Sequence, residues 1–417
     1  MKELKFIKIF EICIGIFALG SVLFPKQVPF FFLALISVVV FGFVKKQVKF
    51  HFNVVSFLFI LFYLTYLFGV FFTHNGDQAQ KYVENKLSFV ILPLLLSLKF
   101  KDTLKLNRAY LGFVIGTFLV SIYGVFSGLY CYFQPDGSNL CLFTSSISPI
   151  HHPTYLSAYL IFSIGVVLKG WYDKMKYFSF YWIIPFIIFN VVLHGFLLSL
   201  SGILFLLIAF ILAIIIWIKY KFGKWVLYSS IILIPILGFL SIKMIPQIEG
   251  EWGGAVGYSE IYFANPEHFV ESRVYPMSGT EVRIVMWTAA SKTFYTHPFG
   301  VGTGNVDEYL GKELIRLKQK ELSHENYNPH NQFLQTGVEI GVLGLLILLA
   351  ILFFAFRIGY LNVDWLLIII TGNLLFNALF ESMLQRQSGI VFYTFWFCLL
   401  VLDNMKKNED SENKQSH

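Results

Sequence analysis

The stretch "NPHNQFLQTGVEIGVLGLL", residues 328–346, joins a polar cluster directly to an apolar run. Pro329, His330 and Asn331 stand where the apolar residues begin, and Glu339 is the one acidic residue within the run. A histidine in this place would lie at a membrane surface if the apolar run crosses a membrane. The composition of the whole chain decides whether it does.

The composition places the chain among membrane proteins. Of 417 residues, 56% are hydrophobic, 14% are charged and 47 are phenylalanines. In an ordinary soluble domain, about a quarter of the residues are charged. The proportions here exclude such a domain and predict a polytopic membrane protein.

Apolar segments of membrane-spanning length recur along the chain. A span needs roughly 20 mostly apolar residues, and about twelve segments meet or approach this length. They are 7–24, 28–44, 54–73, 87–98, 109–130, 154–168, 180–197, 199–218, 225–244, 342–357, 363–381 and 388–402. The fourth is short and contains Pro93, so we expect it to be broken or tilted. The first has no small-residue cleavage site, so we expect it to be a retained span rather than a signal peptide.

The basic residues predict the orientation of these spans. Lysines and arginines gather in alternate segments, around positions 2–8, 45–49, 99–108, 169–176, 219–224, 357 and 406–414. Short cytoplasmic loops hold such an excess, so both termini are predicted to be cytoplasmic. Topology and anionic membrane lipids then account for the net charge of +7. We therefore predict no nucleic-acid partner.

The spans divide the chain into four parts. Residues 1–244 are predicted to hold nine transmembrane helices, 245–341 one large subdomain on the outer face, 342–402 three more helices, and 403–417 a disordered cytoplasmic tail. Within the subdomain, "EGEWGGAVG" (249–257) predicts coil, and a helix is expected from 279 until the proline after His297 ends it. A glycine turn follows, and 306–322 predicts a second, amphipathic helix.

Four cysteines are present. Cys13 and Cys398 fall in spans, where we expect them to be inert. Cys131 and Cys141 fall in an outer loop, and the Pro-Asp-Gly sequence between them favours a turn that would bring them together. A disulfide and two free thiols both stay open from the sequence. No metal-ligand spacing is present, so no metal is predicted.

Several ordered motifs resemble a known family. Arg283 precedes Trp287 by one helical turn, "HPFGVGTGN" (297–305) follows, and "HNQFLQTGVEIGVLG" (330–344) comes after a loop. This order is similar to the shared C-terminal region of the O-antigen ligase and O-antigen polymerase superfamily of bacterial lipid-linked glycan transferases. "HHPTYLSAY" (151–159) and "ESMLQRQSG" (381–389) resemble patterns of one branch.

The resemblance implies a fold and a reaction. The fold would be an all-α, GT-C-like polytopic membrane protein with about twelve transmembrane helices and one large periplasmic loop subdomain. Such enzymes of the bacterial inner membrane take a glycan from undecaprenyl diphosphate and pass it to an acceptor hydroxyl, with a lipid A core sugar as the leading acceptor. The implied partners are this donor, a glycan acceptor and membrane lipids, and no cofactor is required.

The reaction needs a group that holds the diphosphate and a group that handles the acceptor hydroxyl. Arg283 matches the loop arginine of the family and is predicted to hold the leaving diphosphate, because a guanidinium matches phosphate geometry. His330 is predicted to orient or deprotonate the hydroxyl, since imidazole accepts a proton near neutral pH. Alternatively, Arg283 pairs with Glu281 on a solvated helix. The cluster around His330, with Asn331, could also cap a helix, and the two roles are compatible.

Four further residues are predicted to bind substrate: Arg386, His152, Asn331 and His151. Arg386 could instead form an ion pair with Glu381 or Glu339, and the two adjacent histidines could be structural. Glu339 follows His330 by nine residues, which places it on the opposite helix face, so we expect it to anchor another helix or a basic residue. The backbone amides of the glycine turn after His297 could bind an anionic oxygen, but we expect the turn to have a structural role.

One stretch departs from the family pattern. Members commonly carry a basic residue after a serine pair near spans seven and eight, whereas "LLSLSGILFLL" (197–207) contains Ser199, Ser201 and Gly202 but no Arg or Lys. If that cation binds the donor phosphate in the family, another residue such as Arg386 replaces it here, or the activity differs.

Three alternatives to a ligase remain open from the sequence. A polymerase would use a second lipid-linked glycan as acceptor, and a protein O-oligosaccharyltransferase would use a serine or threonine. A polysaccharide transporter or flippase, in a different class, would show repeated halves or charge pairs at midspan. The sequence shows no such repeat.

Overall fold

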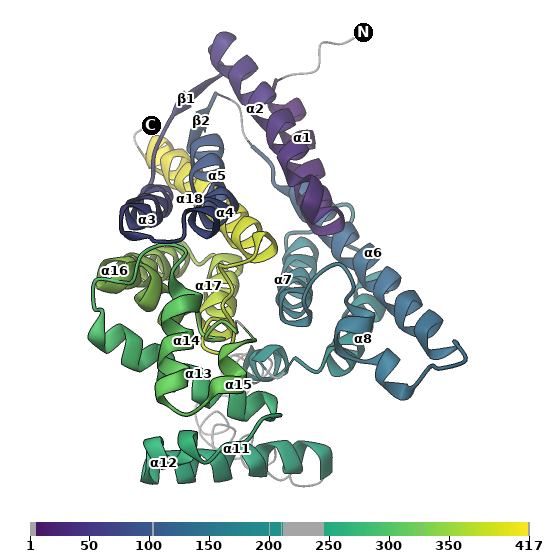
Figure 1. Ribbon diagram of the computed structural model, residues 1–417. Helices are drawn as coiled ribbons and strands as arrows, with labels where there is room; N and C mark the ends of the chain where they lie inside the picture. The colour runs from purple at the N-terminus through teal and green to yellow at the C-terminus, as the bar shows by residue number, and fades with distance from the viewer. Residues whose placement is uncertain are drawn as a thin grey trace, which may run out of the picture.

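The computed structural model describes residues 6–101, 104–199, 201–209, 211, 246–325 and 327–415. These residues are mostly helical, with one two-stranded antiparallel sheet (Figure 1). The N-terminal helices are α1 (Phe6–Leu23), α2 (Val28–Val44), α3 (Val54–Gly69), α4 (Gly76–Lys86), α5 (Ser88–Leu96), α6 (Asn107–Tyr132), α7 (Pro153–Tyr172) and α8 (Phe180–Leu197). The later helices are α11 (Pro246–Ala264), α12 (Pro266–Glu271), α13 (Gly279–Thr296), α14 (Val306–Arg316), α15 (Lys320–Ser323), α16 (Gln332–Leu361), α17 (Trp365–Asn377) and α18 (Gln387–Gln415).

Seven of the described helical segments are long and apolar enough to cross a membrane. They are Phe6–Leu23, Pro25–Val44, Val54–Phe72, Asn107–Tyr132, Pro153–Tyr172, Gln332–Leu361 and Gln387–Met405. Two shorter apolar helices, Tyr181–Leu197 and Trp365–Asn377, match further expected spans. This is the pattern of an all-α polytopic membrane protein. The expected span 87–98 is not one helix of spanning length, because α5 contains Pro93 and ends at Leu96. The expected span 225–244 lies outside the described residues, and so do residues 200, 210 and 212–218 of the expected span 199–218.

Close backbone contact explains why α1 and α6 run side by side (Figure 1). A Cβ atom on Gly112 would collide with the backbone carbonyl of Gly15, and one on Gly15 would lie 2.9 Å from the Arg108 carbonyl oxygen. Small residues at such a crossing let two helices approach more closely than larger side chains allow. Buried aromatic side chains such as Phe113 and Trp396 then pack α6 against α7 and α18.

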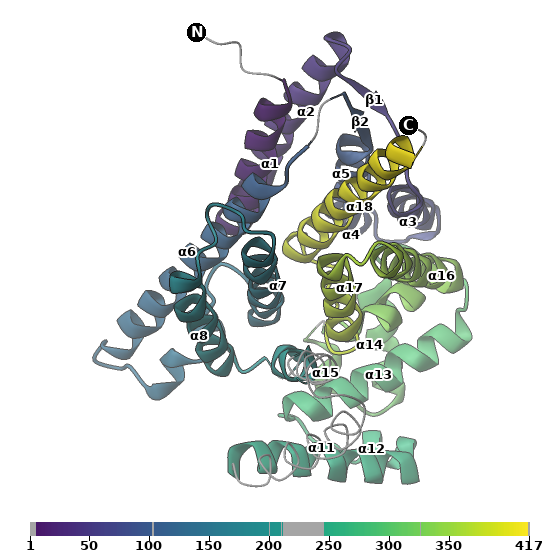
Figure 2. The same cartoon turned by 180° about the vertical axis from the view of Figure 1, so that it is seen from behind.

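The two ends of the molecule differ in composition. β1 (Val48–Phe50) pairs with β2 (Leu98–Phe100), with Lys49 opposite Lys99, and this sheet lies at the same end as the start of α1 and the end of α18 (Figures 1 and 2). Helices α11–α15 lie at the other end. The chain therefore gathers both termini and several lysines at one end, and its largest inter-span segment at the other.

The segment between α8 and α16 contains a small core of its own. Phe269, Val285, Leu310 and Leu322 are buried there, in four different helices. α13 ends at Thr296, one residue before His297, as predicted, and begins with a capping box between Ser278 and Glu281.

Three local predictions were wrong in detail. The glycine-rich residues 249–257, expected as coil, belong to helix α11. The single helix expected over 306–322 is two helices, because α14 ends at Arg316 and α15 starts at Lys320, with Lys318 in a left-handed conformation between them. α18 continues to Gln415, so it includes most of the tail predicted to be disordered.

The glycine turn after α13 forms hydrogen bonds with α16 at the point where that helix is interrupted. Gly341 has φ +72°, which interrupts the helical hydrogen bonds of α16. The turn completes them: the amides of Val301 and Gly302 donate to the carbonyls of Val338 and Glu339, at 2.8 and 3.1 Å. Gly300 has φ +90°, and a Cβ there would lie 2.7 Å from the Gly341 nitrogen. Because these amides are occupied by backbone, the turn is a scaffold and not an anion-binding nest.

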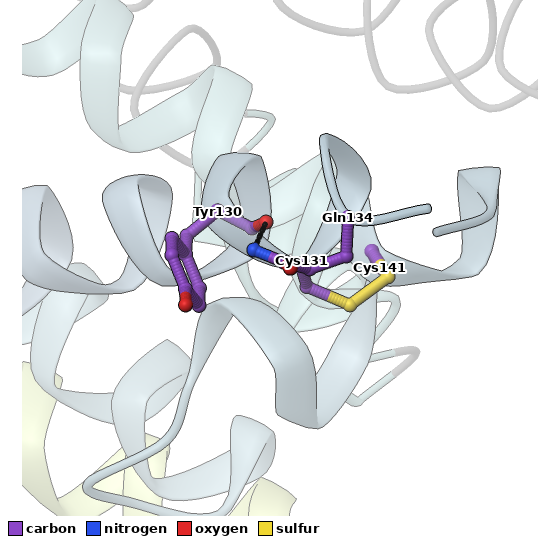
Figure 3. The surroundings of a disulfide bond; sticks show 4 residues. All are labelled: Tyr130, Cys131, Gln134 and Cys141. Atoms are coloured by element: carbon purple, nitrogen blue, oxygen red, sulfur yellow. Dashed lines mark hydrogen bonds between the residues drawn. A yellow bond between two sulfur atoms is a disulfide. The ribbon is translucent and has the colours of Figure 1, made fainter. Parts of the chain in front are cut away.

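The sulfurs of Cys131 and Cys141 form a disulfide, one of the two outcomes that the sequence left open (Figure 3). Cys131 lies near the end of α6 and Cys141 in the 3-10 helix Asn139–Leu142. Gln134, between them, donates to the carbonyl oxygen of Tyr130 at 3.4 Å. The bond holds the loop after α6 close to the helix end.

The disulfide predicts a simple change in thiol count. Alkylation of the unfolded protein without reductant should modify Cys13 and Cys398 alone, and alkylation after reduction should modify Cys131 and Cys141 as well. Mass spectrometry of the digested protein reports both states. Alkylation of Cys141 before reduction would contradict the assignment.

Candidate functional site

His330 and Glu381 form the centre of the candidate site. His330 lies just before α16 and Glu381 just after α17. His330 Nδ1 lies 3.1 Å from Glu381 Oε2, and the two side chains are 22% and 8% exposed. As expected, Glu339 is not the partner of His330.

Hydrogen bonds at the start of α16 hold His330 in place. Asn328 Oδ1 accepts from the His330 amide at 2.8 Å and from Ser382 Oγ at 3.1 Å. Asn331 Oδ1 accepts from the first amides of α16, at 3.0 Å, and its Nδ2 donates to the Leu379 carbonyl at 3.1 Å. Asn331 is therefore a helix cap that also ties α16 to the α17–α18 connection. Its predicted role in substrate binding stays a prediction.

The contact with Glu381 determines which nitrogen of His330 is available. Burial alone would raise the pKa of the Glu381 carboxyl, but its hydrogen bond with His330 and the nearby imidazole charges lower it, and the net shift is downward. An ionised Glu381 accepts a hydrogen bond from Nδ1–H, which leaves Nε2 with its lone pair. The pair can thus accept a proton at Nε2 and stabilise the imidazolium that forms.

Arg283 has no acidic partner among the described residues. Glu281, the alternative partner weighed from the sequence, instead binds Arg273 at 3.0 Å and the Ser278 amide at 3.0 Å. Arg283 Nε is buried and has no hydrogen-bond partner. The alternative of a Glu281–Arg283 pair is therefore wrong, and the Arg283 guanidinium is left to bind another group.

Trp287 lies one turn after Arg283 on α13. Its ring centroid is 6.5 Å from that of Phe380, which belongs to the α17–α18 connection, so this face of α13 meets that connection. Trp287 Nε1 is buried and also lacks a hydrogen-bond partner among the residues that the structure describes. Two unpaired N–H donors, one from each residue, therefore lie on one helix face beside the connection that carries Glu381.

Arg386 lies at the end of the same connection, directly before α18. Its side chain is exposed and forms no ion pair within the described part of the chain. Both sequence-based alternatives fail, because Glu381 binds His330 and Glu339 accepts from Gln385 at 3.0 Å. Arg386 is thus a second arginine without an acidic partner.

Electrostatic effects on His152 show that the predicted residues lie near one another. His152 is exposed and directly precedes α7. The surrounding protein removes part of its water and so lowers its pKa, nearby cations lower it further, and one carboxylate raises it. The basic groups near it are Arg386, His330 and Arg283, of which the two arginines are permanently charged, and the carboxylate is Glu381. We call Arg283, His152, His330 and Arg386 the cationic cluster.

His151 lies outside this cluster. It is 3% exposed, its Nε2 lies 2.7 Å from the Val22 carbonyl oxygen, and its Nδ1 lies 3.0 Å from Ser388 Oγ. Burial lowers the pKa of His151 to about 4, so the ring is neutral near pH 7. Both nitrogens are used within the protein, and the structural role weighed for this residue describes it better than substrate binding.

The stretch that departs from the family pattern packs into the helix bundle. Ser201 Oγ donates to Asn377 Oδ1 at 2.9 Å, four residues before Glu381. Gly202 lies so close to Ser157 of α7 that a Cβ would collide with its hydroxyl. The stretch thus lies beside α17, whose last residue is Asn377, and Arg386 stays the replacement cation that the sequence analysis named.

Two other features of the described residues lie apart from the cluster. A cavity of about 530 Å³ lies between α4, α14 and α15 and is lined by polar side chains that include Asp307 and His324, but by no member of the cationic cluster. No group of three or more His, Cys, Asp or Glu residues in the described ranges is arranged to hold a metal ion.

The sequence analysis missed the roles of Glu381 and Lys86. Glu381 was considered only as a partner of Arg386, although it is the partner of His330. Lys86 was given no role from the sequence, although it is fully buried. The available signal was the same for both: an ionisable residue at the end of an apolar segment is costly to bury and so has a specific partner.

Known proteins offer a comparison for the chain as a whole. A comparison with curated proteins finds no match. Residues 185–349 match the family model described as O-Antigen ligase. The matched region begins in α8 and includes Arg283, His330 and the glycine turn between them. It confirms the resemblance that these motifs indicated and places this region of the chain in the O-antigen ligase superfamily.

Proposed function

We propose that the protein transfers a glycan from undecaprenyl diphosphate to an acceptor hydroxyl at the periplasmic face of the bacterial inner membrane. The observation that carries the proposal is the cationic cluster, in which two arginines without acidic partners lie near a histidine that a carboxylate orients. The family match favours a glycan ligase or transferase in general.

The two arginines would bind the diphosphate of the donor. A diphosphate offers several acceptor oxygens, and each charge-assisted hydrogen bond to it is worth about 1.5–3 kcal/mol. Arg283 and Arg386 approach from α13 and from the start of α18, so they can contact different oxygens. The unpaired indole N–H of Trp287 offers a neutral donor on the same helix face as Arg283.

His330 would act on the acceptor hydroxyl. Its Nε2 takes the hydroxyl proton while the hydroxyl oxygen attacks the anomeric carbon of the donor sugar. The bond between that carbon and the diphosphate oxygen breaks, and its electron pair leaves with undecaprenyl diphosphate. The arginines stabilise the charge that grows on the diphosphate, and Glu381 stabilises the imidazolium.

The proposed side of the membrane follows from the ends of the molecule. The start of α1, the end of α18 and the lysine-bearing sheet lie at the end opposite to α11–α15 (Figures 1 and 2). Cytoplasmic loops carry the lysine excess, so the end with α11–α15 would be periplasmic. We retain twelve spans as part of this proposal, with three of them in or around 87–98 and 199–244.

The acceptor distinguishes the remaining alternatives, and we propose a lipid A core sugar. The test uses purified protein in lipid nanodiscs with an undecaprenyl-diphosphate-linked glycan and, separately, lipid A core, a second lipid-linked glycan, or a serine-containing peptide. Transfer to lipid A core is the expected result. Growth of the glycan or modification of the peptide would identify a different acceptor and leave the proposed donor unchanged. The absence of a covalent product with every acceptor would overturn the proposal.

Removal of either unpaired arginine should weaken donor binding. Arg283→Ala and Arg386→Ala are each expected to raise the Kd for undecaprenyl diphosphate in nanodiscs by about tenfold or more, because each loses a charge-assisted contact. Arg316→Ala is the matched control, since Arg316 is an exposed arginine of the same subdomain that pairs with Glu313. Unchanged affinity in both cluster variants would remove the arginines from the proposal.

The His330–Glu381 pair should affect the chemical step more than binding. His330→Ala and Glu381→Gln are expected to reduce the rate of transfer by about 10²-fold or more, which is the usual size of general-base catalysis. The Kd for undecaprenyl diphosphate should change much less, since neither side chain is a cation that the diphosphate requires. Full transfer activity in Glu381→Gln would show that the carboxylate does not assist His330.

Accessibility in intact cells tests the orientation. A cysteine introduced by Lys320→Cys, at an exposed site in α15, should react with a membrane-impermeant maleimide. A cysteine introduced by Lys45→Cys, exposed at the opposite end, should react only after permeabilisation. The reverse pattern would place the cationic cluster in the cytoplasm and exclude the proposed encounter.

A further inference from the structure

Lys86 is a buried lysine that the proposed reaction does not use. It is the last residue of α4 and is 0% exposed. Its Nζ lies 4.4 Å from the ring centroid of Tyr66 and 4.9 Å from that of Tyr82. Two aromatic faces stabilise an ammonium group, but a buried charge also needs an electrostatic partner.

Gln385 connects Lys86 to that partner. Lys86 Nζ donates to Gln385 Oε1 at 2.9 Å, and Gln385 Nε2 donates to Glu339 Oε2 at 3.0 Å. The amide has its acceptor toward the cation and its donor toward the anion. With the opposite orientation, both contacts would be repulsive, so the two charges fix the orientation of the Gln385 side chain.

Glu339 is also buried and has hydrogen-bond partners within the protein. It is 0% exposed, and its Oε2 also accepts from Gln335 Nε2, one turn earlier on α16, at 3.2 Å. Its backbone carbonyl accepts from the Gly302 amide of the glycine turn. Burial lowers the pKa of Lys86, and the charge of Glu339 opposes this shift. The charge of Lys86 thus depends on the nearby carboxylate of Glu339.

This buried group borders the cationic cluster. Gln385 is the residue before Arg386, and the Leu384 amide donates to Gln332 Oε1 of α16 at 2.6 Å. The backbone on the N-terminal side of Arg386 is therefore fixed by a side chain of α16 and by the amide held between Lys86 and Glu339. Arg386 itself has an exposed side chain, so its position depends on this backbone.

We infer that Lys86, Gln385 and Glu339 are positioning residues that hold Arg386 in place to bind the donor diphosphate. The inference rests on the proposed function, because it assumes that Arg386 binds a diphosphate. It assigns to Lys86 an indirect role, since the lysine is buried behind Gln385 and the assigned contact with the diphosphate is made by Arg386.

Packing alone would not require these charges. Burying an ion pair costs desolvation, and apolar side chains of similar volume are often as stabilising. Lys86, Gln385 and Glu339 come from three separate parts of the chain, α4, the α17–α18 connection and α16. A charge-oriented amide fixes one arrangement of these three parts, whereas apolar packing would permit several.

The test is a double-mutant cycle in nanodiscs, with undecaprenyl diphosphate as the probe. Lys86→Met keeps the length of the side chain, removes its charge and is expected to raise the Kd by about tenfold. In an Arg386→Ala background, the same change should alter the Kd by less than about twofold, because the effect is transmitted through Arg386. Lys81→Met, at an exposed lysine of the same helix, should leave the Kd unchanged.

A second variant tests the inference if the first one does not fold. If Lys86→Met does not fold, Lys86→Met/Glu339→Gln removes both buried charges together and should restore thermal stability while the Kd stays raised. An effect of Lys86→Met that persists in full in the Arg386→Ala background would overturn the inference and indicate a general structural role, as would an unchanged Kd in a folded variant. By contrast, an unchanged Kd in Arg386→Ala itself would contradict the diphosphate-binding role that the proposed function gives to Arg386, and with it the premise of this inference.

Discussion

The hydrogen bonds that join the start of α16 to the α17–α18 connection determine the rest of the site. The Gln332 amide donates to the Ala378 carbonyl at 2.7 Å, and Gln332 Oε1 accepts from the Leu384 amide. Two segments about fifty residues apart in sequence are thereby fixed side by side. This joint brings His330 against Glu381, and Arg386 follows on the same connection.

The distribution of carboxylates gives the site its charge. Glu281, Glu339 and Glu381 each have partners within the protein, namely Arg273, the amides of Gln335 and Gln385, and His330. The two cluster arginines remain without an acidic partner in the described ranges. At a membrane boundary, where water screens charge less than in bulk, such an excess favours an anionic head group.

The sequence could predict most of the components of the site and few of its contacts. Apolar segment lengths and the motif order indicated the membrane fold, the helix before His297 and the candidate residues Arg283, His330 and Arg386. The pairing of His330 with Glu381 could not be predicted, because it depends on how α17 ends beside α16. The side-chain partners of Glu281 and Glu339 could not be predicted either, since each carboxylate had several candidate partners at suitable spacing. The helix at 249–257 was missed because its four glycines have a weak helix propensity.

His330 has φ +47°, a left-handed conformation that costs a residue with a Cβ atom about 1 kcal/mol or more relative to glycine. The Asn328 side chain accepts from the His330 amide and the Asn331 side chain caps the helix that follows, so the protein itself maintains this conformation. The imidazole is therefore preorganised: the protein carries the strain at all times, and substrate arrival requires no backbone rearrangement at this position. A ligand that reaches this position therefore meets an imidazole whose backbone conformation is already set.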